Sequence, residues 1–390
     1  MILVAPGEDV QAVVAAAHEG EIVRLVAGVH QGPVRITHTL TLEGEPGASL
    51  VGRGKGTVLS VLADGVHVRN LALSGSGRDA TSGDAGVLVD KAHRTVLESL
   101  TLDHVLIGLD LRQANDGLVR DCVVRGDVAM PLGMRGDGIR LWESNRNHIE
   151  GNMLESVRDV LAWYADDNWL VDNVIRDSRY GTHLMHTKGN VVAGNRYEDD
   201  VVGVFVMYSR DIDLIGNLVV GAHGAAGMGI GLKESDTIRV SGNRLLGNTV
   251  GIYLDTTPQR IGGSAFLSGN LLGYNATGLR FHGGQTGALV AANNFYENTL
   301  QVTVDGHANA AGTTFAGNAW SDFAAYDLDR DGYADLPYEL RSVSGGLTDR
   351  RPSLSYFTGT SAAALLDLLG AAFPMFLPRP ILHDAHPRLG

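Results

Sequence analysis

Short segments in which apolar and polar residues alternate recur through the middle of the chain. They read GIRLW, VLAWY, GTHLMH, GVFVMY, GIGLKE, GIYLD and GLRFH, and most of them open with a glycine. Alternation with a period of two is the pattern of a β-strand with one face in a core and the other face outside it. We therefore expect many short strands, and one alignment of the segments assigns the direction of each side chain.

An asparagine, usually preceded by glycine, recurs about eight positions before most of these segments. It occupies Asn152, Asn173, Asn195, Asn217, Asn243, Asn270, Asn294 and Asn318, in steps of 21, 22, 22, 26, 27, 24 and 24 residues. Fixed spacing, turn residues and alternation together predict an all-β fold, a right-handed single-stranded parallel β-helix whose coils stack about 4.8 Å apart. We expect the asparagines to stack their side-chain amides and to adopt the left-handed turn conformation.

The repeat divides the chain into four regions. Residues 1–20 form an N-terminal cap with a short helix, because Val10, Val13, Val14 and Ala17 fall on one helical face. The β-helix spans 21–320, an acidic Asp-rich turn segment spans 321–345, and a tail spans 346–390. The tail contains an apolar helix, and the tail either caps the last coil or docks on a partner.

Composition excludes several classes of partner. The formal charge is −13 with a pI near 5.5, so no basic field attracts nucleic acid or an anionic membrane surface. No stretch reaches the roughly 18 apolar residues of a membrane span. The single cysteine, Cys122, allows no internal disulfide and lies in an apolar run, which favours a buried thiol. The opening residues MILVAPGEDV do not have the form of a secretory signal.

The alignment places soft metal ligands on the outer face of neighbouring strands. Two rows point inward, through positions such as Leu141, Ala162 and Leu184, so the residues between them point outward. The outward or nearby residues with imidazole or thioether groups are His183, Met185, His186, Met207 and Met228. These groups select Cu(I) over hard cations, and we expect Met185 and Met207 to lie on adjacent coils. Ordinary strand filler and an exposed docking surface are the alternative interpretations.

The same outward rows carry large apolar side chains. They are Trp142, Leu161, Trp163, Phe205 and Tyr253. Stacked on adjacent coils, they predict a continuous apolar patch that a free monomer does not normally leave bare. We expect a partner to dock there, or the C-terminal tail to cover it.

A polar cluster follows on later coils of the same rows. It contains Lys233, Glu234, Asp255, Arg280 and His282. A base and several cations in one groove are what chemistry on uronate sugars requires, since a proton is removed beside a carboxylate and the enolate is stabilised. A row of solvated salt bridges explains the cluster equally well.

The segment YDLDRDGYADLPY has the spacing of a loop that binds a hard cation. Relative positions 1, 3, 5, 7 and 9 are Asp327, Asp329, Asp331, Tyr333 and Asp335, with Gly332 at position 6. Position 12, which normally carries a bidentate glutamate, is Tyr338. A calcium-stabilised turn and an acidic turn without metal both fit this pattern.

Several of these segments together resemble the NosD-type nitrous oxide reductase maturation proteins. The likeness runs from about residue 20 to residue 385 and includes GDGIRLWES, RYGTHLMHT, VGVFVMYSRDI, GMGIGLKES and NAWSDFAAYDLDRDGYADLPYELR. The resemblance implies an extracytoplasmic, periplasmic β-helix that reaches the membrane only through an ABC transporter. It also implies that the protein accepts copper from a chaperone and helps to assemble the copper clusters of nitrous oxide reductase, without catalysis of its own.

Two other classes of protein compete with this interpretation. One is a carbohydrate-active β-helix, such as an alginate-type epimerase or lyase, although the Asp-Pro-His motif of the epimerases does not occur in the sequence. The other is an adhesin-like solenoid that is purely structural. Binding of Cu(I), or formation of unsaturated uronate ends, would distinguish the three.

Overall fold

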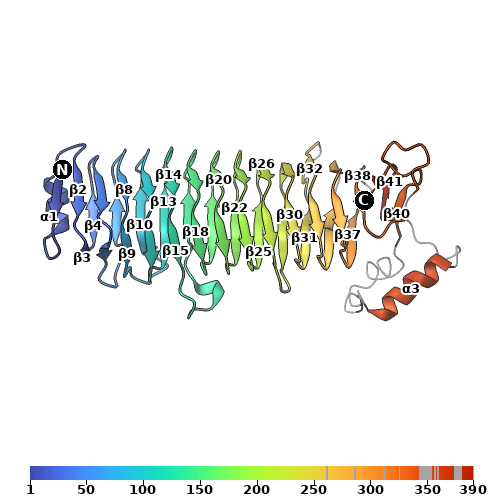
Figure 1. The fold of residues 1–390 in the computed structure, drawn as a ribbon, viewed down its shortest axis with the longest axis horizontal. Coiled ribbons are helices and arrows are strands. Elements are labelled where there is room, and N and C mark those ends of the chain that lie inside the picture. Colours follow the sequence, from blue (N-terminus) through green and yellow to red (C-terminus); the bar gives the residue numbers. More distant parts are fainter. Residues whose placement is uncertain are drawn as a thin grey trace. The chain divides into compact units, whose positions relative to one another are not determined.

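The chain folds into two compact units, each a stack of short parallel strands (Figure 1). The computed structural model describes residues 1–260, 262–284, 287–310, 312–324, 326–341, 354, 357, 360–372 and 380–389. The first unit spans Met1–Val201 and the second spans Val202–Gly390. In both, consecutive strands of the chain belong to three different sheets, so each sheet gains one strand per coil. The predicted parallel β-helix is confirmed.

In the first unit each of the three sheets contains one strand from nearly every coil. The first sheet consists of β1 (Ile2–Val4), β2 (Ile22–Leu25), β5 (Thr41–Gly44), β8 (His67–Arg69), β11 (Val96–Glu98), β14 (Leu118–Arg120), β17 (His148–Glu150), β20 (Trp169–Val171) and β23 (Val191–Ala193). The second consists of β3 (Gly28–Gln31), β6 (Ala48–Val51), β9 (Ala72–Ser74), β12 (Thr101–Asp103), β15 (Val123–Arg125), β18 (Met153–Glu155), β21 (Val174–Arg176) and β24 (Arg196–Glu198). The third consists of β4 (Val34–Ile36), β7 (Leu59–Val61), β10 (Ala85–Asp90), β13 (Ile107–Arg112), β16 (Ile139–Trp142), β19 (Asp159–Trp163) and β22 (Tyr180–Met185).

The second unit repeats the arrangement and ends in an antiparallel pair. Its first sheet consists of β26 (Arg210–Ile215), β29 (Asp236–Ser241), β32 (Ala265–Ser268), β35 (Ala288–Ala291), β38 (Thr313–Ala316), β41 (Leu382–Asp384) and β40 (Tyr338–Leu340), the last two antiparallel. The second consists of β27 (Leu218–Val220), β30 (Arg244–Leu246), β33 (Leu271–Gly273), β36 (Asn294–Tyr296) and β39 (Ala319–Trp320). The third consists of β25 (Val202–Met207), β28 (Met228–Lys233), β31 (Val250–Asp255), β34 (Thr277–Gly284) and β37 (Leu300–Asn309).

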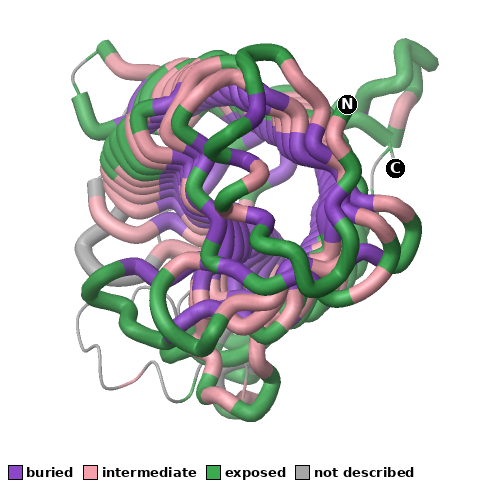
Figure 2. The backbone as a smooth tube through the Cα atoms, turned by 90° about the vertical axis from the view of Figure 1, so that its left-hand side faces the viewer, coloured by how far each residue is buried: buried purple, intermediate pink, exposed green. Residues whose placement is uncertain are grey.

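The predicted inward rows form the core. Leu141, Ala162 and Leu184 are register partners on β16, β19 and β22, and all are buried. In the second unit Val206, Leu232, Leu254 and Phe281 form the corresponding row. Figure 2 shows the buried residues along the inside of the coils and the exposed residues outside and in the loops. Because each coil buries its apolar side chains against the coils on either side, stability comes from stacking.

Buried asparagine amides hold the corners of successive coils. Asn152 donates its backbone N–H and its Nδ2 to Oδ1 of Asn173, and Asn173 does the same to Asn195, at 2.9–3.0 Å. The Nδ2 groups also donate to backbone carbonyls, as from Asn173 to Ile149 at 2.8 Å. These bonds satisfy corner groups that the strands leave unpaired. The predicted amide ladder is confirmed within each unit.

Two details of the predicted ladder were wrong. The ladder passes through Asn293, which donates Nδ2 to Oδ1 of Asn318, whereas Asn294 begins β36 and is half-buried. The left-handed residue is the one before each asparagine, as at Gly151 (φ 64°), Asp172 (φ 54°) and Ala292 (φ 54°). The chain turns at the left-handed residue. The asparagine that follows can therefore place its side-chain amide inside the corner.

Each unit has a segment that covers one of its terminal coils. The helix α1 (Val10–Ala16) buries Val10 and Val14, and the side chain of Gln11 pairs with the backbone N–H and C=O of Arg35 on the edge strand β4. In the second unit, Asp384 of β41 accepts hydrogen bonds from the backbone N–H and Nδ2 of Asn318, at 3.0 and 2.9 Å. Asp384 is therefore the last rung of the asparagine ladder. The boundaries of the four predicted regions stay a prediction.

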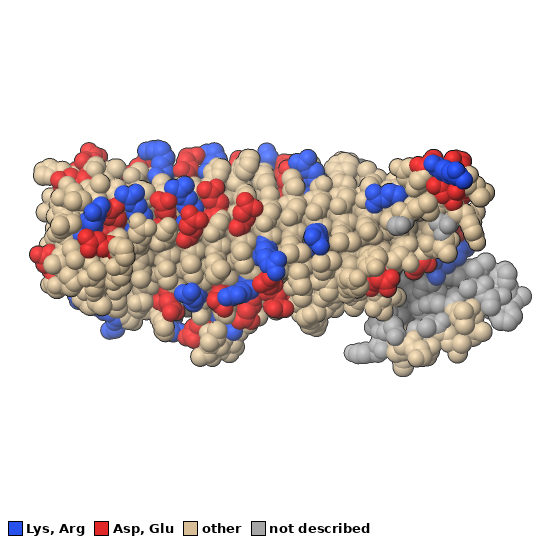
Figure 3. All heavy atoms as spheres, viewed as in Figure 1, with Lys and Arg blue, Asp and Glu red and all other residues tan. Residues whose placement is uncertain are grey.

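The surface charges occur mainly as pairs. Glu43 binds both Arg24 and Arg69, and Glu98 binds both His67 and Arg120, across neighbouring strands of the first sheet. Figure 3 shows acidic and basic side chains close together on the visible face. Within such pairs the two charges largely offset each other locally. Among the described helices, none has the length and apolarity that a membrane span requires.

Replacing Asn293 with alanine tests the ladder. Asn293 is 1% exposed and donates Nδ2 to Leu267 O at 2.8 Å, and its loss leaves the N–H and Nδ2 of Asn270 without their acceptor. We expect Asn293→Ala to lower the free energy of unfolding by about 2–4 kcal/mol. Asn294→Ala, one residue along, is the control and should change it by less than about 0.5 kcal/mol. Equal losses in urea unfolding would contradict the ladder as drawn.

Asp200 occupies a buried corner where other coils place asparagine or serine. Its Oδ1 accepts from the backbone N–H of Ser178 at 2.8 Å, while its Oδ2 is buried and has no hydrogen-bond partner. Burial raises the pKa of Asp200 well above its usual value, and the nearby Asp177, Asp199 and Glu198 raise it further. The neutral acid, which resembles an amide in shape, is the form that this corner favours.

Asp200→Asn should therefore stabilise the protein in a pH-dependent way. A carboxyl whose folded pKa is raised contributes its full stability below the unfolded pKa of about 4, and that stability is lost as the pH rises through the folded pKa. We expect the variant to melt roughly 2 °C or more above the parent at pH 8, and the gain to shrink toward pH 4. A melting-temperature difference that is constant from pH 4 to 8 would show that Asp200 is not buried in its neutral form.

Candidate functional site

The predicted soft ligands of the first unit lie at the end of β22. His183 and Met185 are two residues apart on the same side of the strand, and His186 follows in the turn. Met185 is half-buried and His186 is exposed, with a left-handed φ of 54°. A thioether and an imidazole are thus accessible from outside at one corner of the coil. That donor set suits Cu(I).

His183 is not exposed, and the prediction of an outward, open side chain was wrong. Only 8% of the residue is exposed, its Nδ1 lies 3.6 Å from Oδ2 of Asp159, and its ring meets the edge of Tyr180 at 4.9 Å. The row that contains His183 is occupied by ion pairs. Arg140 in that row binds Asp110, and Arg179 binds Asp159, so charged side chains take the place of open solvent.

Asp159 beside His183 stays ionised in spite of its burial. Desolvation alone would raise its pKa, but interaction with His183 and with the Arg179 guanidinium outweighs that effect and holds the pKa below its usual value. A carboxylate facing one imidazole nitrogen fixes the ring orientation and directs the other nitrogen elsewhere. Histidines that bind metals commonly have such a partner, so Asp159 fits a ligand role for His183.

An exposed aromatic row borders the donors. Trp142, Trp163 and Met185 are register partners on β16, β19 and β22, and the two tryptophans are 41% and 40% exposed. The inclusion of Leu161 in this surface was wrong, because Leu161 is only 9% exposed and lies in the row of Arg140 and His183. The open part of the predicted docking patch in this unit is therefore one row wide.

The remaining predicted ligands and docking residues belong to the second unit. Met207, Met228, Phe205 and Tyr253 are all half-buried. A Cβ at Gly231 would lie 2.8 Å from the Phe205 ring and 3.2 Å from Sδ of Met228, so both side chains use the space that this glycine leaves. The predicted proximity of Met207 to Met185 stays a prediction.

The polar cluster on the second unit is held together by its own contacts. Lys233 lies 3.8 Å from Asp255, the ring of His282 stacks at 6.1 Å on Tyr253, and Arg280 contacts the hydroxyl groups of Thr303 and Thr277 at 3.4 and 3.3 Å. This arrangement is the row of polar pairs that the sequence also allowed. It does not by itself indicate catalysis.

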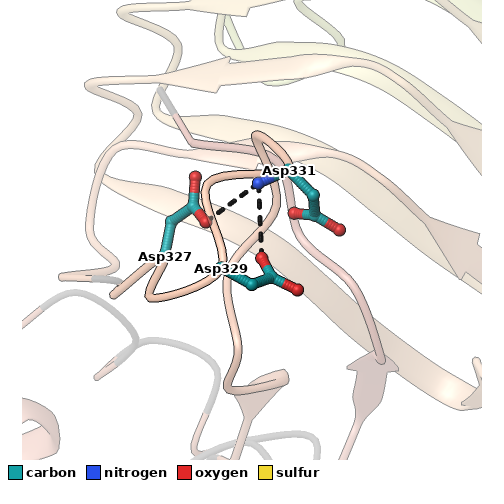
Figure 4. Close-up of side chains that lie close together, drawn as sticks. All are labelled: Asp327, Asp329 and Asp331. Atoms are coloured by element: carbon teal, nitrogen blue, oxygen red, sulfur yellow. Dashed lines mark hydrogen bonds between the residues drawn. The ribbon is translucent and has the colours of Figure 1, made fainter.

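The acidic turn brings three of its carboxylates together (Figure 4). Oxygen atoms of Asp327, Asp329 and Asp331 lie within 4.8 Å of one another, and the backbone N–H of Asp331 donates to both Asp327 and Asp329. Oδ2 of Asp335 accepts from Leu328 N at 2.7 Å, and Tyr333 forms a bridge with Arg388. Tyr338, at the glutamate position, instead hydrogen-bonds to Asp322 and stacks on Trp320. Three convergent carboxylates suit a hard cation such as calcium.

A family model described as "Periplasmic copper-binding protein (NosD)" matches residues 120–325 of the chain, which is more than half of it. The chain belongs to the NosD family. The match includes all five predicted copper ligands and ends just before Asp327. The description of the NosD family supports a copper-related function and an extracytoplasmic location for this member.

Two curated NosD relatives align with almost the whole chain. Both are described as "Probable ABC transporter binding protein NosD". The relative from Pseudomonas aeruginosa is 28% identical over 93% of this chain and 87% of its own length. The relative from Stutzerimonas stutzeri is 27% identical over 93% of this chain and 86% of its own length. These names associate the relatives with a transporter.

A solved structure of another class is similar in fold. It is a mannuronic acid specific polysaccharide family 6 lyase from human gut microbiota, 12% identical, with a TM-score of 0.53 over 84% of this chain and 89% of that chain. At this identity the likeness shows the β-helix that this NosD-family chain shares with the lyase. It carries no information about substrate.

Sequence reasoning missed the groups that surround the soft ligands of this NosD protein. Asp159 and Arg179 beside His183 were not selected, nor was Tyr164, whose ring stacks on His186 at 5.1 Å. The sequence does contain a pattern that could have identified Asp159. Asp137 and Asp159 each lie just before or at the start of a strand, and each is bound by an arginine that follows about one coil later, Arg158 and Arg179. The stacking of Tyr164 depends on the corner conformation, which the alternation pattern does not describe.

Calcium should stabilise the acidic turn and the chain that it holds. Ala334 N donates to Pro387 O at 2.8 Å, so order in the turn is passed to the C-terminal segment. We expect added Ca²⁺ to raise the melting temperature and EDTA to expose the chain near Leu336, which is 53% exposed, to protease. Asp329→Asn should abolish the difference between calcium and EDTA. Identical melting and proteolysis in both conditions for the parent protein would refute the calcium prediction.

Proposed function

We propose that this NosD-family protein is a periplasmic accessory factor that binds Cu(I) during maturation of the copper clusters of nitrous oxide reductase. In this proposal it receives copper from a chaperone, docks on an ABC transporter, and performs no catalysis of its own. The observation that carries the proposal is the outer end of β22, where soft donors lie beside an exposed tryptophan row in a member of a copper-binding family.

The first unit offers three donors of graded accessibility. His186 is exposed, Met185 is half-buried and His183 is nearly covered, with Asp159 at its Nδ1. We propose that Met185 and His186 take the incoming ion first and that the nearly covered imidazole of His183 completes the coordination. In the second unit we propose Met207 and Met228 as the copper-binding donors. Thioether and imidazole ligands hold Cu(I) while leaving it open to exchange with a partner's ligands.

Exposed apolar side chains indicate two surfaces on which partners could dock. Trp142 and Trp163 present apolar area next to the donors, and tryptophan is a preferred anchor in protein interfaces. The helix α3 (Ser361–Ala372) exposes Leu365, Leu366, Leu368 and Leu369 by 42–66%. Since the curated relatives are described as ABC transporter binding proteins, we assign the tryptophan row to the partner that exchanges copper and the α3 leucines to the transporter.

The alternative of uronate chemistry gains no support from the polar cluster. Lys233 and Asp255 pair with each other, and His282 stacks on Tyr253. A catalytic base must reach the proton that it removes, and these contacts hold the side chains against one another. We therefore keep a single proposed function.

Substituting the thioethers tests copper binding directly. Leucine keeps the volume and apolarity of methionine, so Met185→Leu and Met207→Leu remove the sulfur ligands with little effect on packing. Measured anaerobically against a colorimetric Cu(I) chelator, each variant should bind Cu(I) at least about 10-fold more weakly, and the double variant weaker still. Met153→Leu is the matched control, since Met153 is 39% exposed on β18 in another sheet.

Acidity and reductase maturation provide two further readouts of the same variants. Protons compete with copper for imidazole nitrogen but not for thioether sulfur, so Cu(I) binding should weaken but persist at pH 5. Cells that carry the double variant should produce nitrous oxide reductase lacking copper clusters. If the double variant binds Cu(I) like the parent and supports an active reductase, the proposed ligands are wrong.

A further inference from the structure

Three aromatic rings are stacked beside the predicted copper donors. Trp163 ends β19, and its ring lies 5.7 Å from that of Tyr164 at an interplanar angle of 19°. Tyr164 in turn stacks on His186 at 5.1 Å and 8°. The three rings are thus nearly parallel and connect two neighbouring coils. One of them, His186, is a proposed copper ligand.

The corner conformation of the coils aligns Tyr164 with His186. Tyr164 and His186 occupy equivalent positions after β19 and β22, and both have left-handed φ angles, 51° and 54°. Equivalent side chains on adjacent coils project in the same direction, about 4.8 Å apart, which suits ring stacking. The stack is therefore a consequence of having an aromatic residue at the same corner of two successive coils.

Stacking on Tyr164 covers a face of the His186 imidazole and not its edge. The nitrogen lone pair that binds a metal lies in the plane of the ring, so a ring held face-on by Tyr164 still presents its nitrogens sideways. His186 directly follows Met185, and Met185 is the register partner of Trp163. The thioether, the imidazole and the indole therefore project from one small area of the surface.

An indole face attracts cations. Trp163 is 40% exposed, so its ring remains available in spite of the contact with Tyr164. A monovalent soft ion bound by one sulfur and one nitrogen keeps an unfilled side, and a tryptophan face covers such a side without adding a charged ligand. It also keeps water from that side of the ion.

We propose that the stack of Trp163, Tyr164 and His186 forms one wall of the copper site, in which Tyr164 orients the imidazole of His186 and the indole face of Trp163 contacts the bound Cu(I). This inference rests on the proposed copper-binding function and adds two residues to it. Trp163 contacts the ion, and Tyr164 is a positioning residue.

The protein contains a matched pair for comparison. Trp169 and His148 stack at 5.6 Å and 18° on neighbouring strands of the first sheet, and Trp169 is 48% exposed. On the two flanking coils, the register partner of His148 is Leu118 and that of Trp169 is Val191, and neither side chain can bind a metal. A tryptophan–histidine stack without a thioether beside it should not bind copper.

Tryptophan fluorescence with Ag⁺ and anaerobic Cu(I) tests the contact. Ag⁺ is a redox-inert probe with the same charge and a similar preference for thioether and imidazole. The chain has four tryptophans, so each exposed one is replaced in turn. We expect Ag⁺ and Cu(I) to quench the parent protein, Trp163→Phe to lose most of the quenching, and Trp142→Phe and Trp169→Phe to retain it.

Affinities for Ag⁺ and Cu(I) separate the ion contact of Trp163 from the positioning effect of Tyr164. Trp163→Leu should weaken Ag⁺ and Cu(I) binding about 3- to 30-fold, the range expected of a partly exposed cation–π contact. Tyr164→Leu should weaken binding while Tyr164→Phe restores it, because phenylalanine preserves the stack. Thermal melting of each variant shows whether it is folded. The Trp169→Phe variant supplies the baseline for a tryptophan–histidine stack that lacks a thioether.

The outcomes distinguish this inference from the proposed function. If the parent protein binds neither ion, the proposed function fails. If the parent binds the ions and Met185→Leu weakens binding, copper binding stands. The aromatic wall is then refuted if Trp163→Phe is quenched like the parent and if Trp163→Leu and Tyr164→Leu bind the ions like the parent. Equal loss of quenching in Trp169→Phe and Trp163→Phe would also refute it.

Discussion

Every coil of this protein must satisfy the backbone groups at its corners, where the strand hydrogen bonds end and the chain turns inside the stack. From Asn147 onward asparagines do this at two corners of the coil, as in the ladders Asn147–Asn168–Asn190 and Asn152–Asn173–Asn195. Oδ1 of each asparagine accepts from the coil before it, and Nδ2 donates to the asparagine of the coil after it and to a backbone carbonyl, as at Asn173. An unsatisfied buried amide would cost about 1–3 kcal/mol at each corner, so the spacing of the asparagines determines where the coils turn. Asp384 fills the last rung from a segment 66 residues further along the chain.

The ladder leaves the outer faces free to vary. Since the core rows and the corner amides hold the coils, the outward residues are not needed for stacking and can serve other purposes. On most coils they form ion pairs, such as Glu43 with Arg24 and Arg69. At β16, β19 and β22 the outward row instead carries Trp142, Trp163 and Met185. Exposed tryptophans and a thioether add little to the stability of the coil, which is the physical reason for assigning them to binding.

The sequence predicted the features that repeat and missed those that depend on one local contact. The period-two alternation and the asparagine spacing were sufficient for the β-helix and for the inward rows, since each follows from periodicity alone. Asn294 was chosen in place of Asn293 because two asparagines are adjacent, and only the register separates them. The prediction that His183 is open to solvent was wrong, because its exposure depends on Asp159 at the start of β19 and on Arg179 just before β22, which binds Asp159. The stack of Tyr164 on His186 could not be predicted without the left-handed corner that aligns them.

We propose that soft side chains on the outer face of the β-helix bind Cu(I), and the identity of the atoms bonded to the ion is the decisive observation. X-ray absorption at the copper edge of the anaerobically loaded protein reports which elements are bonded to the metal. We expect a three- or lower-coordinate Cu(I) with at least one sulfur, from Met185, and at least one imidazole nitrogen, and we expect the sulfur contribution to fall in Met185→Leu. A spectrum with only nitrogen and oxygen ligands, or one that is unchanged in Met185→Leu, would contradict it.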